Sequence, residues 1–283
     1  MNAQHLIESA RTFLFVPATR PERFVRAHES GADVVILDLE DAVAPDEKPA
    51  ALDAALRWLT GADPQPTTMV RINGSDTVWH DAEVAALAGT GAPLLLPKAE
   101  SAEQVEDLHA RAGRAPVVPL IETPGGVVEA TSVAGAAGVV RLALGHLDLA
   151  AVLGVDPDSY EAFRCTRSQL VLASAYAGLP VPVDGVTTAL DDEERLTRDV
   201  QHAVTLGFGG KLCIHPRQVG VVHDALRPAD DEVAWARRVV GAAAGGGAVS
   251  LDGRMVDPPV VARAHRVLLR ARVDPDTGVG SGC

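Results

Sequence analysis

Eight short apolar runs recur along this chain, and stretches with helical spacing separate them. The runs cover residues 12–16, 34–39, 68–72, 94–96, 117–121, 139–144, 181–183 and 211–214. Most are apolar on both faces, as strands of a parallel sheet must be when helices cover both sides of the sheet. Strands and helices that alternate in this way predict an α/β fold, either a (β/α)8 TIM barrel or a doubly wound open sheet.

The positions of the glycines favour the barrel over the open sheet. A doubly wound sheet usually has a Gly-rich turn after a strand, and neither a G-x-G-x-x-G motif nor a P-loop follows any of the eight runs. The segment GFGGK at 207–211 precedes a strand instead. We therefore predict a (β/α)8 TIM barrel over residues 1–228.

The chain continues past the last run into a predicted C-terminal helical and lid extension over residues 229–272. Helical spacing covers 230–244 and 258–270, and 249–256 is a candidate hairpin or lid between them. The last residues, 273–283, contain Gly, Ser, Asp and Pro with few apolar side chains, so we expect a disordered tail.

Charge and cysteine content exclude several classes of function. The chain carries 25 Lys and Arg against 38 Asp and Glu, a formal net charge of −13, which opposes binding to nucleic acid or to an anionic membrane. No apolar run reaches the roughly 18 residues of a membrane span. The 3 cysteines are too scattered for a disulfide framework, and the N-terminus lacks signal-peptide features. We expect a soluble cytoplasmic protein.

Polar residues follow seven of the eight runs, where a barrel of this type places its active site. They are Asp38, Glu40 and Asp41; Arg71 and Asn73; Lys98; Glu122; His146 and Asp148; Asp184; and His215. Loops are polar in general, so a single one of these residues carries little information. Their shared placement predicts one site in which they converge.

Glu122 and Asp148 follow neighbouring runs, the fifth and the sixth. Adjacent carboxylates repel one another unless they share a proton or a cation. Ligands that are all oxygen favour a hard ion, Mg²⁺ first and Mn²⁺ second. The alternative is that either residue caps a helix or pairs with a lysine.

Arg71, in the segment MVRING, has a planar guanidinium suited to a substrate carboxylate. The alternative is an ion pair with the acids after the second run, and both can hold together. Lys98 is a less specific candidate for substrate binding and is also consistent with a structural role. His146 and His215 are interpreted as packing or hydrogen-bonding residues, because no nucleophilic Ser or Cys accompanies them.

Several segments, in this order along the chain, resemble the citrate lyase β-subunit family of the HpcH/HpaI aldolase superfamily, which includes citryl-CoA, malyl-CoA and citramalyl-CoA lyases. They are RTFLFVPATRPERFVRA (11–27), GADVVILDLEDAVAPDEK (31–48), VRING (70–74), LPKAE (96–100), LIETPGGV (120–127), LALGHLDLAAVLG (142–154), DGV (184–186) and GFGGKLCIHPRQV (207–219). The resemblance covers residues 11 to 270 and implies a Mg²⁺-dependent lyase on a TIM barrel, a homotrimer or a hexamer built from trimers.

The resemblance also implies a role for individual residues. Glu122 and Asp148 would bind the metal, and Glu40 and Asp41 would surround the metal's waters. Arg71 would hold the substrate's oxygens, and Arg11 and Lys48 would make polar or CoA contacts. Asp257 would reach the site from a neighbouring subunit's lid. The chain departs from the family pattern at Ala18, at Pro124–Gly126 and at Pro258 and Pro259.

These residue types suit the cleavage of a β-hydroxyacyl thioester into an oxoacid and a shorter acyl-CoA, a step that passes through an enolate. The metal would polarise the developing carbonyl, and Arg71 would stabilise negative charge. Four alternatives remain open. They are a class II aldolase on free hydroxy-oxo acids, an acyl-CoA thioesterase, a citrate lyase subunit that works with an acyl-carrier protein, and a non-catalytic binding protein.

Overall fold

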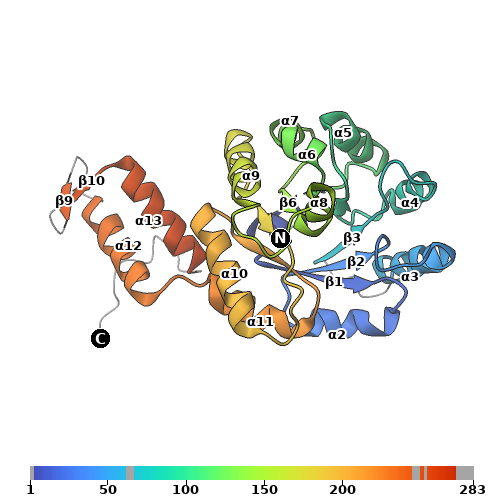
Figure 1. The fold of residues 1–283 in the computed structure, drawn as a ribbon, viewed down its shortest axis with the longest axis horizontal. Coiled ribbons are helices and arrows are strands. Elements are labelled where there is room, and N and C mark those ends of the chain that lie inside the picture. The colour runs from blue at the N-terminus through green and yellow to red at the C-terminus, as the bar shows by residue number, and fades with distance from the viewer. Residues whose placement is uncertain (1–2, 62–66, 244–248, 252–253, 272–283) are drawn as a thin grey trace. The chain divides into compact units, whose positions relative to one another are not determined.

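Eight parallel strands close into a barrel in chain order in the computed structural model, which describes residues 3–61, 67–243, 249–251 and 254–271 (Figure 1). The strands are β1 (Thr12–Pro17), β2 (Val34–Asp38), β3 (Thr68–Arg71), β4 (Leu94–Leu96), β5 (Val117–Ile121), β6 (Ala143–Leu144), β7 (Val183–Asp184) and β8 (Gly210–Cys213). Pairing of β1 with β8, Phe13 opposite Leu212, closes the barrel. The predicted (β/α)8 TIM barrel with C-terminal helices is confirmed.

The interior of the barrel is filled by apolar side chains from all of its strands, as in other barrels of this type. They include Phe13, Ile36, Met69, Leu95, Val118, Leu120, Ala143, Val183 and Leu212, each at most 3% exposed. Alternate residues of the same strands, such as Leu14, Val35 and Val70, are fully buried on the outer face. This burial on both faces explains why most of the runs are apolar on both faces.

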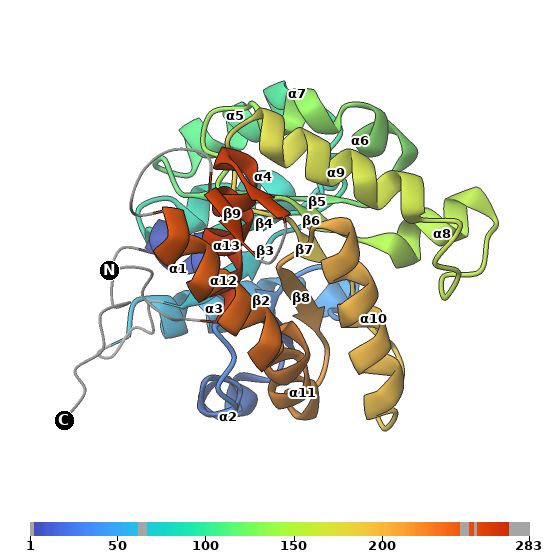
Figure 2. The ribbon, with the colours of Figure 1, turned by 90° about the vertical axis from the view of Figure 1, so that its left-hand side faces the viewer.

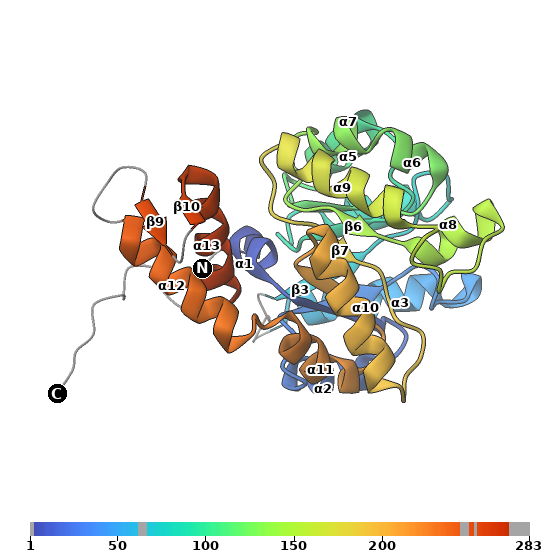
Figure 3. The same cartoon turned by 60° about the vertical axis from the view of Figure 1, so that its left-hand side comes forward.

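Helices surround the barrel, with α2 and α11 on one side and α5, α7 and α9 on the other (Figures 2 and 3). The helices are α1 (Ala3–Ser9), α2 (Phe24–Glu29), α3 (Lys48–Leu59), α4 (His80–Leu87), α5 (Ala102–Arg111), α6 (Pro124–Val128), α7 (Ala130–Ala134), α8 (His146–Leu153), α9 (Arg164–Tyr176), α10 (Glu193–Leu206) and α11 (Pro216–Leu226). Short 3-10 helices, η1 (Pro21–Arg23) and η2 (Pro45–Glu47), precede α2 and α3. Ser101 and Gln104 form a capping box at the start of α5.

The N-terminal end of the barrel is closed by one fully buried cation. Arg141 is 1% exposed, and its guanidinium donates hydrogen bonds to the carbonyl oxygens of Ile7 (2.9 Å), Ala10 (2.6 Å) and Val181 (2.7 Å). Burial lowers the pKa of Arg141 to about 10. The side chain therefore ties α1 and the segment before β1 to the sheet.

A second compact unit follows the barrel, since the chain divides into Met1–His223 and Asp224–Cys283. The second unit contains α12 (Asp230–Ala243), β9 (Val249–Leu251), β10 (Arg254–Val256) and α13 (Pro258–Arg270), and β9 and β10 pair antiparallel. Ala236, Val239 and Leu268 belong to its own apolar cluster. The predicted disordered tail lies outside the described residues. Among those described, no helix is long and apolar enough to cross a membrane.

Candidate active site

A cleft of about 390 Å³ opens at the C-terminal ends of the strands. Its polar lining residues are Asp38, Asp41, Arg71, Glu122, His146 and Asp148, and its apolar ones are Phe15, Pro17, Ala42, Leu120, Leu144, Leu147, Val186, Leu212 and Ile214. Parallel strands bring these residues together because their carboxyl ends meet at the same end of the barrel. The cleft therefore combines an acidic part with an apolar part.

Arg71, the last residue of β3, is held by one acid that ends β2 and by two acids that follow it. Its Nε and Nη2 donate to the two carboxylate oxygens of Asp38, at 2.7 and 2.6 Å. Its Nη1 lies 3.0 Å from carboxylate oxygens of both Glu40 and Asp41. Burial would lower the pKa of Arg71, but these three carboxylates outweigh it and raise the pKa. The ion pair that the sequence left as an alternative is thus present, and Arg71 also lines the cleft.

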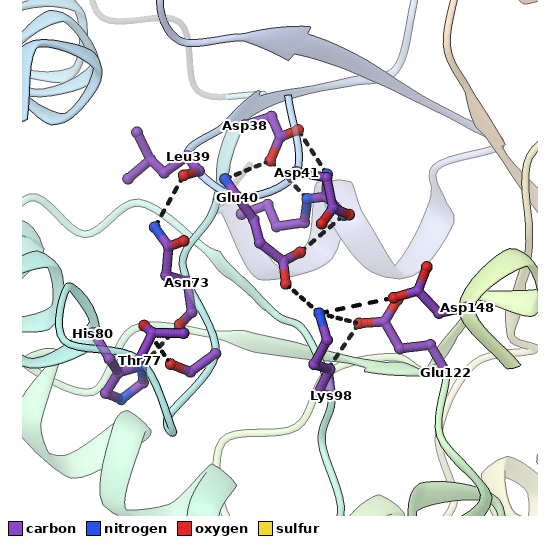
Figure 4. Close-up of polar contacts among 12 residues, drawn as sticks. Asp38, Leu39, Glu40, Asp41, Asn73, Thr77, His80, Lys98, Glu122 and Asp148 are labelled. Atoms are coloured by element: carbon purple, nitrogen blue, oxygen red, sulfur yellow. Dashed lines mark hydrogen bonds and ion pairs between the residues drawn. The ribbon is translucent and has the colours of Figure 1, made fainter. Parts of the chain in front are cut away.

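Lys98 links the two groups of acids, as Figure 4 shows. Its Nζ lies 2.6 Å from Glu40 Oε1, 3.8 Å from Asp148 Oδ2 and 4.0 Å from Glu122 Oε1. Its main-chain nitrogen donates to Glu122 Oε1 at 2.9 Å, and its φ of 50° lies in the left-handed region. Burial raises the pKa of Glu40, against the opposing effects of Arg71 and Lys98.

Glu122 follows β5 and is 4% exposed, whereas Asp148 lies in the first turn of α8. Burial, and next the charge of Glu40, raise the pKa of Glu122 to about 8. The carboxylate packs against the main chain at Gly145, where an added Cβ would lie 2.5 Å from Glu122 Oε2. Only glycine at this position leaves room for the observed place of Glu122.

Glu122 and Asp148 fit a hard divalent cation that also takes ligands from water and substrate. The described residues contain no group of three or more His, Cys, Asp and Glu side chains able to hold a metal. However, these two carboxylates offer only oxygen ligands, and both lie within 4.0 Å of one ammonium group. Burial first, and the charge of Glu40 next, raise the pKa of Glu122, and a bound cation would oppose both effects by stabilising the ionised carboxylate.

Other predicted site residues lie elsewhere. Arg11 directly precedes β1, at the end of the strand away from the cleft, and its main-chain nitrogen donates to Asp33 Oδ2 at 2.8 Å, so its contact with substrate stays a prediction. Lys48 is 5% exposed, and its ammonium donates to the carbonyl oxygens of Leu39 (2.8 Å) and Glu40 (2.9 Å), which argues against the predicted substrate contact. Asp257, the predicted lid residue, lies in the second unit, where its carboxylate caps α13 by accepting a hydrogen bond from Val260 N at 3.1 Å. Its predicted role at a neighbouring subunit's site stays a prediction.

Glu83 was not predicted from the sequence. It is 2% exposed in α4, and its carboxylate accepts hydrogen bonds from the main-chain nitrogen and the amide of Asn73. The sequence does carry a signal for it, because Glu83 shares the buried face of α4 with Val84 and Leu87. A carboxylate on an apolar helix face needs buried partners.

A second pocket, of about 410 Å³, lies beside the cleft and shares Phe15, Pro17 and Ile214 with it. Its basic lining residues are Arg23, Arg26, His215 and Arg217. In a chain with a net charge of −13, this concentration of basic side chains gives the pocket a positive charge that would attract anions.

The sequence profile described as HpcH/HpaI aldolase/citrate lyase matches residues 11–216. The chain belongs to this family. A citrate lyase subunit beta-like protein of Mycobacterium tuberculosis is 43% identical over 267 residues, which cover 92% of this chain and 94% of that protein. A (3S)-malyl-CoA thioesterase of Cereibacter sphaeroides is 33% identical over 276 residues, 94% of this chain and 96% of that protein.

A solved structure extends the likeness within the HpcH/HpaI aldolase/citrate lyase family. CitE from Mycobacterium tuberculosis, crystallised with magnesium, acetoacetate and coenzyme A, has a TM-score of 0.82 and 39% identity, covering 93% of this chain and 98% of that one. The resemblance predicted from the sequence motifs is confirmed.

Proposed function

We propose that this chain is a Mg²⁺-dependent carbon–carbon lyase that cleaves a short β-hydroxyacyl-CoA, such as citramalyl-, malyl- or citryl-CoA, into an oxoacid and a shorter acyl-CoA. The observation that carries the proposal is the Glu122–Asp148 carboxylate pair in the cleft that Arg71 also lines. The proposal is also supported by the family of the chain and by the similar CitE structure, which was crystallised with magnesium and coenzyme A.

Glu122 and Asp148 are the residues that would hold the ion, with Mg²⁺ preferred over Mn²⁺. When bound there, the cation supplies Lewis-acid polarisation of the oxoacid carbonyl that develops as the bond breaks. Arg71 is oriented before substrate arrives, because Asp38 holds two of its nitrogens. Its guanidinium would bind substrate oxygens on which negative charge increases.

Two proton transfers complete the reaction. A base removes the proton of the substrate hydroxyl, the carbon–carbon bond breaks, and its electron pair forms the enolate of the shorter acyl-CoA. An acid then protonates the enolate carbon. Glu40 and Asp41 hold Arg71 and shape the acidic part of the cleft. Asp257, from the second unit of a neighbouring subunit in a homotrimer, is our candidate for one of the transfers.

The basic pocket beside the cleft supports a CoA thioester over a free acid. Arginine forks bind phosphate groups through paired hydrogen bonds, and Arg23, Arg26 and Arg217 lie in this pocket. Because the pocket shares Phe15, Pro17 and Ile214 with the cleft, a molecule anchored there by phosphates has its other end near Arg71.

Thioester hydrolysis is the second candidate, favoured by the malyl-CoA thioesterase among the relatives. Here water would attack the thioester carbonyl, and the products would be free CoA and the intact hydroxy acid. The two activities share the same binding site and differ in which bond breaks.

A panel of malyl-, citramalyl- and citryl-CoA, incubated with Mg²⁺ or with EDTA, tests the proposal. We expect release of an oxoacid and of a shorter acyl-CoA that depends on Mg²⁺, without free thiol. Free thiol without oxoacid would favour the thioesterase. Cleavage of free hydroxy-oxo acids, with every thioester inert, would refute the proposal and favour an aldolase.

A further inference from the structure

Two main-chain carbonyls beside the cleft are held by buried side chains that do not line it. The ammonium of Lys48 donates to the carbonyl oxygens of Leu39 (2.8 Å) and Glu40 (2.9 Å). The amide of Asn73 donates to the carbonyl oxygen of Leu39 at 2.9 Å (Figure 4). The loop after β2 is therefore fixed at the residue that carries the Glu40 side chain.

Asn73 is itself fixed by its neighbours on α4. Its main-chain nitrogen donates to Glu83 Oε2 (2.7 Å), its side-chain amide donates to Glu83 Oε1 (2.5 Å), and its carbonyl oxygen accepts from His80 Nδ1 (2.9 Å). Asn73 and Glu83 are each 2% exposed, and Lys48 is 5% exposed. We call Lys48, Asn73 and Glu83 the loop clamp.

The side chain of Glu40 extends from this fixed backbone and holds the ammonium group of Lys98. Glu40 Oε1 is 2.6 Å from Lys98 Nζ, whereas the oxygens of Asp148 and Glu122 are 3.8 and 4.0 Å from the same atom. Lys98 is thus bound closely by Glu40 and more loosely by the other two carboxylates. If Glu40 moved away, the ammonium would pair with Asp148 and Glu122 and would compete there with a divalent cation.

We propose that the loop clamp positions Glu40 and thereby keeps Lys98 out of the cation site between Glu122 and Asp148. These are positioning roles, since the clamp acts through Glu40 and not on the substrate. The inference rests on the proposed function only in taking Mg²⁺ as the ion, and its test needs no substrate.

Calorimetric titration with Mg²⁺ tests the clamp on the full chain. We expect Lys48→Met and Glu40→Gln each to weaken Mg²⁺ binding about 10- to 100-fold, the usual cost of removing a residue that supports metal ligands. The double variant should bind no more weakly than the weaker single variant, because both changes release the same ammonium. Losses that multiply in the double variant would overturn the proposal.

The Lys48→Met change is also measured in a protein that carries Lys98→Met, because this variant lacks the ammonium group proposed to compete with Mg²⁺. We expect Lys48→Met to leave Mg²⁺ affinity unchanged there, and a loss of the same size as in the wild type would refute the mechanism. Lys211→Met is the matched control, because it removes a second buried lysine that pairs with Asp184 (3.0 Å) and does not contact Glu40. Any loss of Mg²⁺ affinity that it causes should multiply with the loss caused by Glu40→Gln.

Glu83→Gln replaces Lys48→Met if the latter does not fold, because it alters the clamp without changing side-chain volume. Normal Mg²⁺ binding by folded Glu83→Gln and Lys48→Met proteins would overturn the clamp. The proposed function is judged separately, because a wild type that binds Mg²⁺ but cleaves no thioester refutes the lyase and leaves the clamp standing.

Discussion

Glu122→Gln tests whether the cleft contains a buried negative charge that requires a cation. Glu122 is 4% exposed, and burial raises its pKa to about 8 from an ordinary value of 4.5. Because the pKa is higher in the folded state, the ionised carboxylate destabilises the fold. The metal-free wild type should therefore lose stability, relative to the variant, as the pH rises from 4.5 to 8.

The size of this effect follows from the interval between the two pKa values. At about 1.36 kcal/mol per pH unit, the interval from 4.5 to about 8 corresponds to roughly 4 kcal/mol at pH 8 and to less than about 1 kcal/mol at pH 5. In a chain of this size, 1 kcal/mol shifts the melting temperature by roughly 2 °C. The variant should therefore melt roughly 8 °C above the wild type at pH 8 in EDTA.

Thermal unfolding followed by circular dichroism measures this difference. At pH 5 in EDTA the two proteins should melt within roughly 2 °C of each other, and at pH 8 saturating Mg²⁺ should raise the melting temperature of the wild type alone. Glu129→Gln, the same change at an exposed position, is the matched control. A difference that does not vary with pH, or equal stabilisation of both proteins by Mg²⁺, would refute the argument.

Three further predictions concern the same cleft. Gly145→Ala should weaken Mg²⁺ binding about tenfold in calorimetry, because the added Cβ displaces Glu122. Gly220→Ala is the control, since nothing lies within 4 Å of its added Cβ, and it should bind Mg²⁺ like the wild type. Equal Mg²⁺ affinities of the two variants would contradict this prediction. Arg71→Ala should lower kcat by roughly 10²–10³. It should also destabilise the fold by about 3–5 kcal/mol in thermal unfolding, since Asp38 would be buried without its partner; an unchanged melting temperature would argue against that ion pair. EDTA should abolish oxoacid release and added Mg²⁺ should restore it, and turnover that persists in EDTA would exclude a metal-dependent step.

The barrel could be predicted because its strands are buried on both faces. The sixth and seventh strands were predicted with the wrong extent, since residues 139–144 and 181–183 are mostly apolar but only Ala143–Leu144 and Val183–Asp184 form strands. Arg141 and Val181 take part in the closure at the barrel's N-terminal end, and Val139 makes only an isolated bridge to Val117. Apolar composition cannot distinguish buried irregular backbone from a strand.

The candidate site could be predicted where a residue ends a strand or comes within a few residues of its end. Arg71, Glu122 and Asp148 meet for this reason. The direction of a long side chain cannot be predicted in this way, so Lys48 was expected at the substrate although it bonds main-chain carbonyls. Arg11 was carried over from the family resemblance without regard to which end of its strand it occupies.

The Arg141 closure limits how the chain can be shortened for expression. Two of its acceptors, Ile7 and Ala10, lie in or just after α1. A truncation that begins at Arg11 would remove both carbonyls, and hydrogen bonds to a charged group contribute about 1.5–3 kcal/mol each. The first helix therefore stabilises the barrel, even though every residue proposed for catalysis lies at the far end of the strands or in the second unit.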